Sequence, residues 1–415
     1  MERHVGHRHG GGEMIFGEWV YVVFLIGAAA VFRFLPGRAR PWWLAACGLA
    51  FYAYYSPAFV WLLAVELAVV FALVRGVRRS ALAFGGALAV TIGVLVAYKY
   101  GALLSSTLAS AATVLRAGRL PSFPQLALPL AISFFTFEFV HYVVDARKGT
   151  LPEHRLEDFL AFMLFFPTMV AGPIKRFQDF QPQLTTARAS AEDINAGITR
   201  IVVGLAKKVV IADTIAPLTT PLLSNTGVGE ASAAQLLVAL LAFAVKIYMD
   251  FSGYSDIAIG SARLFGIHVP ENFAWPYLRR NVAEFWRHWH MSLTSWITDY
   301  VYKPLGGNRR GLALTALNVV IAMAVSGLWH GAQWHFVAWG LYHGVLLALF
   351  RLWERGLKPL LLTRLPVLRE GRVARAVGRA GALTGGAATF ALVTLGWGLF
   401  VMPVGRFIEL LGRLL

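Results

Sequence analysis

Long apolar runs recur along nearly the whole chain and constrain its fold more than any other feature. Many are about 18 to 22 residues long, the length that an α-helix needs to cross the hydrocarbon core of a bilayer. Hydrophobic residues make up 57% of the 415 residues and charged residues only 14%, whereas soluble domains carry about 25% charged residues. The pattern predicts an all-α polytopic membrane protein, with one domain over 14–415 after a disordered tail at 1–13.

The apolar runs locate the candidate transmembrane helices. No small-residue cleavage site follows the first run, so we expect a retained span there and not a signal peptide. A shorter run at 102–116 is rich in Ser, Thr and Ala, and we expect it to be partly inserted or packed against other helices. The full candidates lie at 15–35, 41–56, 58–74, 81–98, 126–145, 157–172, 195–217, 232–250, 311–329, 333–350 and 382–402.

The net charge of +16 fits a membrane protein better than a nucleic-acid-binding protein. The basic residues lie in short loops, with no continuous basic helix or recognition motif, so we expect no nucleic-acid partner. Positive loops face the cytoplasm, which places the N-terminus outside and a basic loop at 351–381 inside. The loops after the first and third runs carry the arginines that set this orientation: Arg33, Arg38, Arg40, Arg75, Arg78 and Arg79.

Two further features distinguish the chain from a set of simple spanning helices. Proline interrupts or ends many runs, as at Pro129, Pro167 and Pro173. Broken helices at membrane depth persist only where protein or a water-filled cavity satisfies the freed backbone groups. The segment 275–310 holds six basic residues against two acidic ones, with tryptophans interleaved. An interfacial or re-entrant helix fits that mixture.

His330 is the first candidate for chemistry. The 311–329 and 333–350 runs predict a hairpin that points away from the cytoplasm, with His330 and Gln333 at or below its tip. A neutral imidazole can accept a proton from a hydroxyl and return one to a leaving group. Gly331 permits a close backbone approach or an unusual φ. The alternative is that His330 is a hydrogen-bonded packing residue. The neighbouring Trp329 and Gln333 favour a functional site.

His290 is the second candidate. On one helix His288 and His290 would diverge by about 200°, so only one of them can face a given site. Glu284 and Arg287 lie one or two turns earlier, where they could orient His290 or tune its pKa. An interfacial histidine bonded to lipid headgroups explains the sequence equally well.

The segment 250–256 carries two acids and three hydroxyls. Asp250, Tyr254, Ser255 and Asp256 could hold a polar substrate. We favour a structural alternative, a helix break whose Ser and Asp cap the next helix.

Several other kinds of site find no support. The single Cys47 excludes an internal disulfide and a multi-cysteine zinc site, and we expect it to be a small buried packing residue. Five histidines occur between 288 and 343, yet no His-Glu-x-x-His spacing appears, so we expect no metal. Serine-hydrolase and phosphate-binding loop motifs are absent from the sequence.

Six sequence blocks, in order, resemble those of the membrane-bound O-acyltransferase (MBOAT) family, and within it the bacterial alginate and polysaccharide O-acetyltransferases. They are LPLAISFFTF (128–137), FPTMVAGP (166–173), DFSGYSD (250–256), PENF (270–273), EFWRHWHMSL (284–293) and WHGA (329–332). The tail at 1–13 departs from the pattern, and the chain stops soon after 396–398, where many relatives continue.

The resemblance implies a ring of about 10–12 tilted transmembrane helices, with re-entrant or interfacial helices, around a central funnel. His330 matches the family's signature catalytic histidine and His290 a second histidine associated with activity. We expect Glu284, Trp286, Arg287, Trp329 and Gln333 to support the site, together with the 250–256 segment.

The function that the resemblance implies is acyl transfer, with acetyl as the first candidate, in the inner (plasma) membrane. Cytoplasmic acetyl-CoA would be the donor, with no tightly bound cofactor. The acceptor would be an extracytoplasmic polysaccharide such as alginate, or a periplasmic or membrane-anchored partner that completes the transfer, and membrane lipid surrounds the protein. D-alanyl transfer to teichoic acid and a polar-solute transporter or channel are the alternatives.

Overall fold

The computed structural model describes residues 18–116, 124, 126–365 and 371–415. The tail predicted at 1–13 lies outside them. Every regular element of the described residues is a helix. The α-helices are α1 (Trp19–Phe34), α2 (Arg40–Tyr55), α3 (Val60–Val74), α4 (Ala81–Leu95), α5 (Gly101–Val114), α6 (Ile132–Lys148), α7 (Leu156–Met163), α8 (Phe166–Met169), α9 (Phe177–Phe180), α10 (Ala191–Leu205), α11 (Asp213–Ile215), α12 (Thr220–Leu223), α13 (Gly227–Glu230), α14 (Ala233–Arg263), α15 (Val282–His288), α16 (Met291–Ile297), α17 (Gly311–His330), α18 (Trp334–Leu352), α19 (Lys358–Arg364), α20 (Gly371–Val401) and α21 (Val404–Leu414).

Six continuous helical segments of the described chain are long and apolar enough to cross a membrane. A further apolar helix, α1, is shorter. The prediction of an all-α polytopic membrane protein is therefore confirmed. The six segments are Pro57–Val74, Ala81–Val114, Ala233–Arg263, Gly311–His330, Trp334–Arg364 and Arg379–Val401.

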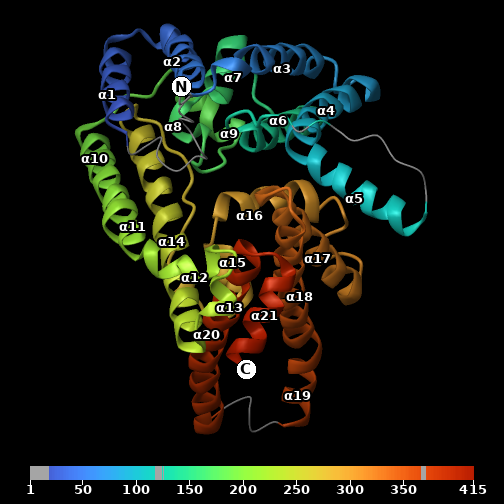
Figure 1. Ribbon diagram of the computed structural model, residues 1–415. Helices are drawn as coiled ribbons and strands as arrows, with labels where there is room; N and C mark the ends of the chain where they lie inside the picture. Colours follow the sequence, from blue (N-terminus) through green and yellow to red (C-terminus); the bar gives the residue numbers. More distant parts are fainter. Residues whose placement is uncertain (1–17, 117–123, 125, 366–370) are drawn as a thin grey trace, which may run out of the picture.

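The helices form two parts that are joined along one side (Figure 1). Helices α1 to α9 make up one end and α15 to α21 the other, while α10 and α14 run side by side between them. Each part has its own buried apolar core. A third, smaller cluster includes Phe137, Trp296 and Trp329 and lies where the two parts meet. Cys47 is buried in the first core, as expected.

Helix α14 corrects the prediction of a helix break at 250–256. It begins at a capping box formed by Ser232 and Gln235 and continues without interruption to Arg263. Glycines let it approach α10 closely: a Cβ on Gly204 would lie 2.6 Å from the carbonyl oxygen of Gly253. Such small-residue contacts are a common way to pack helices in a membrane.

The prediction of a loop at 351–381 is also wrong for the residues that the structure describes. Helix α18 continues through a π-helical turn (Trp353–Leu357) into α19, and α20 begins at Gly371. The run at 102–116 is not packed against other described helices along its length, and its partial insertion stays a prediction. It is α5, which continues α4 through another π-helical turn (Val96–Tyr100) with most side chains partly or fully exposed.

The predicted hairpin at 311–329 and 333–350 is confirmed as α17 and α18. Glycines hold its two helices together. A Cβ on Gly327 would lie 2.1 Å from the carbonyl oxygen of Phe336, and one on Gly340 would lie 2.3 Å from that of Met323. The close contact fixes the level at which α17 ends, and hence the position of His330.

Candidate active site

His290 and His330 lie against the same indole. His330 is the last residue of α17, and its ring centroid lies 4.7 Å from that of Trp329. The centroid of His290 lies 5.8 Å from the same Trp329 ring. Two histidines that are forty positions apart in the sequence therefore meet at the junction of the two parts of the fold.

Aromatic rings surround His330 on its other sides. The ring centroids of Trp339 and Phe400 lie 5.2 and 5.1 Å from its own. His330 nevertheless keeps part of its surface exposed. Gly331 has an extended backbone, with φ of −167°, so an unusual φ is not the reason for glycine here. The reason is space, because a Cβ would lie 2.1 Å from the ring of Phe336.

His290 lies in a break between two short helices, not in the single helix that the sequence predicted for this region. Helix α15 ends at His288 and α16 begins at Met291. His290 between them has a left-handed backbone, with φ of 44°. Non-glycine residues adopt this conformation at a cost, and they keep it only where surrounding contacts hold it.

Asn272 supplies those contacts. Its side chain is fully buried, accepts a hydrogen bond from the Ser292 hydroxyl at 2.6 Å and donates one to Ser255 on α14 at 3.1 Å. Its backbone carbonyl accepts from the Met291 N–H at 2.9 Å. Asn272 therefore anchors both residues that follow His290, and it was not singled out in the sequence.

Several buried polar atoms in the site have no hydrogen-bond partner among the described residues. Buried polar groups are normally satisfied, so a group of such atoms in one place marks a candidate functional site. Both ring nitrogens of His290 are among them. The others around the aromatic cluster are Nε1 of Trp286, Trp329 and Trp339 and both ring nitrogens of His343.

Helix α6 holds α16 and α17 together through stacked rings. Phe137 stacks on Trp296 at 4.1 Å between centroids and on Trp329 at 5.2 Å. The Trp296 indole N–H also donates to the Phe137 carbonyl oxygen at 3.0 Å. One α6 side chain thus sets the spacing between the helices that carry the two histidines.

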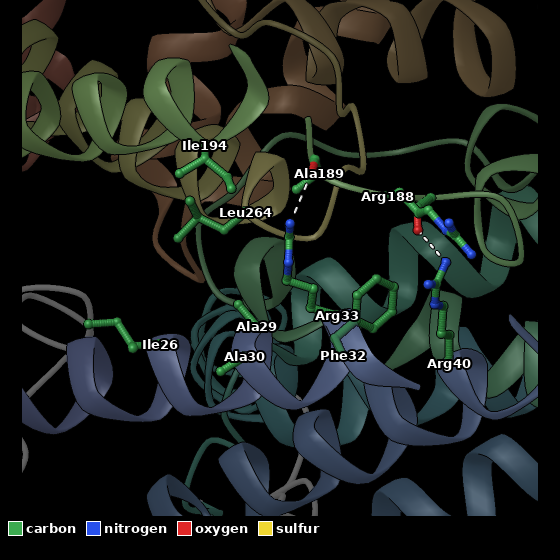
Figure 2. A pocket seen from close by; sticks show the side chains of 11 residues that line it. Ile26, Ala29, Ala30, Phe32, Arg33, Arg40, Arg188, Ala189, Ile194 and Leu264 are labelled. Atoms are coloured by element: carbon green, nitrogen blue, oxygen red, sulfur yellow. Dashed lines mark hydrogen bonds between the residues drawn. The ribbon is translucent and has the colours of Figure 1, made fainter. Parts of the chain in front are cut away.

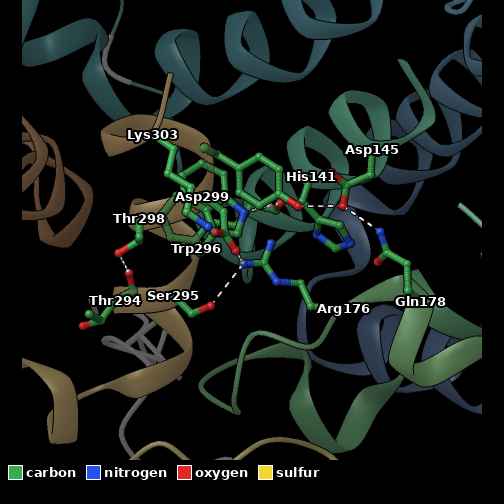
Figure 3. Close-up of polar contacts among 12 residues, drawn as sticks. His141, Asp145, Arg176, Gln178, Thr294, Ser295, Trp296, Thr298, Asp299 and Lys303 are labelled. Atoms are coloured by element: carbon green, nitrogen blue, oxygen red, sulfur yellow. Dashed lines mark hydrogen bonds and ion pairs between the residues drawn. The ribbon is translucent and has the colours of Figure 1, made fainter. Parts of the chain in front are cut away.

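Residues 174–178 strap α6 and α16 together, since each contacts one of them. The Ile174 N–H donates to Ser292, and the Phe177 N–H to His141. The polar side chains extend the strap (Figure 3). Lys175 pairs with Glu138, Arg176 contacts Asp299 and Ser295, and Gln178 contacts Asp145. Tyr300 also donates a hydrogen bond to Asp145. The strap fixes α16, which carries the backbone after His290.

Lys99 and Tyr100 hold the end of α17 and were missed in the sequence. The last carbonyls of a helix have no partner within it. The Tyr100 hydroxyl donates to the Leu328 carbonyl oxygen at 2.8 Å, and the Lys99 ammonium donates to that of Trp329 and to Ser133. The sequence did contain a signal for Lys99, because a lysine inside a long apolar helix, here Ala81–Val114, is a candidate functional residue.

A cavity of about 620 Å³ lies among α15, α16, α17 and α18. Ser326, which is buried in its wall, is one helical turn before His330, and Thr294 is one turn after His290. The buried Trp286 indole also lines it. The cavity therefore extends to within a turn of each histidine.

The opposite end of the cavity is basic. Lys358 pairs with Glu354 there, whereas Arg351 and Arg355 have no carboxylate within 4.0 Å among the described residues. Arg287 lines the cavity from α15, nearer to His290 in sequence, and has no such carboxylate either. Arg351 donates to the Tyr302 hydroxyl at 2.9 Å. An anion could bind at this end without displacing an existing ion pair.

The predicted supporting residues divide between the site and other places. Glu284, Trp286 and Arg287 line the cavity, and Trp329 lies between the histidines. The expectation that Glu284 or Arg287 orients His290 is not met. Glu284 accepts from the Arg280 N–H at 3.3 Å and Arg287 is exposed, because the helix break turns His290 away from α15. Gln333 is an exposed residue at the start of α18.

The 250–256 segment holds α14 against α10 and the turn after it. Asp250 pairs with Lys208 at 3.0 Å, and Asp256 with Lys207 at 2.5 Å. Tyr254 packs beside the first core, and Ser255 is the buried residue that accepts from Asn272. The two acids are thus paired with lysines of the neighbouring segment, and a contact with substrate stays a prediction. Within the described ranges, no three His, Cys, Asp or Glu side chains are grouped to hold a metal ion.

Comparison with known proteins gives this arrangement a family. The model of the MBOAT, membrane-bound O-acyltransferase family matches residues 80–367, which include both histidines and the cavity. The chain belongs to the membrane-bound O-acyltransferase family. The sequence resemblance is confirmed, and with the six apolar helices it makes the chain a multi-pass membrane protein.

Curated relatives carry several activities. The chain is 42% identical over 229 residues to the probable alginate O-acetylase of Azotobacter vinelandii, over 54% of this chain and 45% of that protein. It is 35% identical over 257 residues to the peptidoglycan O-acetyltransferase of Helicobacter pylori, over 54% and 48%. It is 33% identical over 257 residues to the teichoic acid D-alanyltransferase of Streptococcus thermophilus, over 56% and 61%. The chain spans about half the length of the curated relatives it matches.

Proposed function

We propose that the protein is an O-acyltransferase that moves an acyl group, with acetyl as the first candidate, onto hydroxyls of an extracytoplasmic polysaccharide such as alginate. Transfer to a periplasmic or membrane-anchored partner that completes the reaction is the same chemistry with a different acceptor. The observation that carries the proposal is the pair of imidazoles on Trp329, one helical turn from a cavity with a basic opening. The named alginate O-acetylase relative supports the acetyl group.

Acetyl-CoA suits the cavity as donor. Pockets for small ligands and cofactors have volumes of about 300–1,000 Å³, and this cavity has about 620 Å³. The phosphates of the donor would lie at Arg287, Arg351 and Arg355, where guanidinium groups can bind them through paired hydrogen bonds. The thioester would extend past Trp286 toward the histidines. No tightly bound cofactor is required.

In the proposed reaction His330 is the general base. It accepts the proton of the acceptor hydroxyl, whose oxygen attacks the thioester carbonyl carbon. The carbon–sulfur bond then breaks, an ester forms and the proton goes to the departing thiolate. The negative oxygen of the tetrahedral intermediate needs a donor. The indole N–H groups of Trp286 and Trp329 and the His290 ring have no hydrogen-bond partner among the described residues, so they are candidates for this role.

D-alanyl transfer to teichoic acid is the second candidate, because a named D-alanyltransferase is 33% identical to the chain. It would use the same histidines with a different donor. The orientation proposed for either reaction puts the protein in the inner membrane with the cavity opening on the cytoplasmic side and the N-terminus outside. The basic helix ends around Arg351 and Arg355 support that orientation.

A reconstituted assay separates the candidates. Purified protein in proteoliposomes receives labelled acetyl-CoA or a carrier protein loaded with labelled D-alanine, together with acetyl-free polysaccharide or teichoic acid. We expect label from acetyl-CoA on the polysaccharide, reduced at least about a hundredfold by His290→Ala. The matched control is His288→Ala, because the His288 ring bonds only to the Glu284 carbonyl of its own helix among described residues. Label from D-alanine alone would favour the second candidate, and solute flux without acyl transfer would contradict both.

A further inference from the structure

A second cavity, of about 470 Å³, lies outside the histidine site. It is lined by α1, the start of α2, residues 187–189, Ile194 of α10 and Leu264, which follows the end of α14. Its lining shares no residue with the cavity among α15 to α18. Figure 2 shows that it combines two kinds of surface, arginine head groups and short apolar side chains of α1.

Three arginines supply its charge. Arg40 is buried, donates to the carbonyl oxygens of Leu35 and Ala187 and lies over the Phe32 ring at 5.1 Å. Arg33 and Arg188 are exposed at the opening, and among the described residues the Arg33 side chain has one hydrogen bond, a 3.5 Å contact with the Ala189 carbonyl oxygen. The lining contains no acidic side chain. No carboxylate of the described chain lies within 4.0 Å of these guanidinium groups.

Two acids follow Arg188 closely in sequence, Glu192 and Asp193. Glu192 is exposed and lies within 4.0 Å of no basic group of the described residues, and Asp193 is already engaged. It accepts from Ser190 and pairs with Arg263 at 3.4 Å and His268 at 3.2 Å. Burial alone would raise the pKa of Asp193, but the Ser190 hydrogen bonds and the neighbouring charges lower it below its usual value. Asp193 therefore stays ionised on its own partners, and the positive charge of the cavity is not cancelled.

The other wall of the cavity is continuous with an apolar outer face. Ile26, Ala29 and Ala30 of α1 line it with Ile194 and Leu264. Ile26 is 60% exposed, and neighbouring α1 side chains extend the same kind of surface, with Val23 at 60% and Phe34 at 84%. In a multi-pass membrane protein such a face contacts lipid chains. The arginines thus lie where the end of an apolar helix meets polar loops.

We propose that this cavity binds the phosphate headgroup of an anionic phospholipid, with one acyl chain along the α1 face. Guanidinium groups that lack carboxylate partners bind phosphate through charge-assisted hydrogen bonds. Basic pockets at the ends of membrane helices bind anionic lipid headgroups by the same physics. A soluble phosphate would use the arginines but would gain nothing from Ile26, and this difference separates the two sources.

The test measures lipid binding to the full chain in detergent by native mass spectrometry, with phosphatidylglycerol, phosphatidylethanolamine and soluble glycerol phosphate as separate probes. We expect phosphatidylglycerol to bind in preference to phosphatidylethanolamine. The double variant R33A/R188A should weaken phosphatidylglycerol binding about thirtyfold, from the usual value of a basic group near an anionic lipid. R38A/R79A is the matched control, because it removes two exposed arginines that do not line the cavity.

A second variant tests the apolar wall. Ile26→Gln keeps all three arginines and should still lower phosphatidylglycerol binding by about tenfold, because the acyl chain loses apolar contact. Equal phosphatidylglycerol binding by the wild type and R33A/R188A would overturn the proposal. So would equal loss in R38A/R79A, no preference over phosphatidylethanolamine, phosphatidylglycerol binding that is unchanged by Ile26→Gln, or glycerol phosphate that binds as tightly as phosphatidylglycerol.

Discussion

Gly340→Ala tests whether the close contact of α17 and α18 positions His330. The new Cβ would lie 2.3 Å from the Met323 carbonyl oxygen, whereas ordinary contacts begin near 3.4 Å. The obstructing atom is backbone, so the helices themselves must separate, by roughly 1 Å if the contact is to become normal. Overpacking of this kind costs about 1–3 kcal/mol of stability. Because Met323 is two helical turns before His330 and lines the cavity, the displacement reaches the end of α17 that carries His330.

A displacement of about 1 Å at a reacting group can cost about a hundredfold in rate, so we expect acyl transfer by Gly340→Ala to fall by about that factor. The assay is labelled acetyl transfer in membranes, normalised to the folded protein measured by size-exclusion chromatography. Gly93→Ala is the matched control, since it is also a helical glycine but its Cβ would meet nothing within 4 Å. Alanine should be tolerated there or add up to about 1 kcal/mol of helix stability. Wild-type transfer by Gly340→Ala would refute the reasoning.

Three further substitutions address other parts of the site. Lys99→Met leaves the Trp329 carbonyl without its ammonium donor, so it should lower the transfer rate at least about tenfold and the free energy of unfolding by about 1–3 kcal/mol. A wild-type rate with an unchanged melting temperature would contradict this. Asn272→Leu removes the partner of two buried serines and should lower the melting temperature by an amount equivalent to about 1–3 kcal/mol, along with activity; thermal unfolding in detergent measures it, and an unchanged melting temperature would count against the role of Asn272. Arg355→Glu should raise the KM for acetyl-CoA roughly tenfold, less at high salt, with little change in kcat; donor titrations at two salt concentrations measure it, and an unchanged KM would argue against the basic opening.

The sequence predicted the features that depend on local pattern. Apolar runs of spanning length gave the α17–α18 hairpin and the membrane class. The prediction failed at Asp250 and Asp256, where charges inside an apolar run suggested a helix break. Lys207 and Lys208, in the π-helical segment after α10 that packs on α14, pair with the two acids. Helix α14 therefore continues through both acids. Such a pairing between separate helices has no signature in either segment alone.

The sequence singled out the candidate reactive residues and missed the residues that support them. His290, His330, Trp286 and Trp329 were singled out by residue type within an apolar chain, and the structure brings them together. The helix break at His290 depends on Asn272, which lies eighteen positions earlier and acts through tertiary contacts. Lys99 acts on Trp329 across a still longer separation. A helical projection of one segment cannot show either contact.

The most direct test of the central claim is the acyl content of surface glycans in cells that carry defined variants. Mass spectrometry would compare cells with the wild type, His330→Ala, His268→Ala or no gene, with membrane levels of each protein measured in parallel. His268 is a control because its side chain is 54% exposed and pairs with Asp193, away from the proposed reaction. If His330 handles the proton of the transfer, His330→Ala will match cells without the gene while His268→Ala matches the wild type. Acylation that persists in cells with His330→Ala would contradict the account.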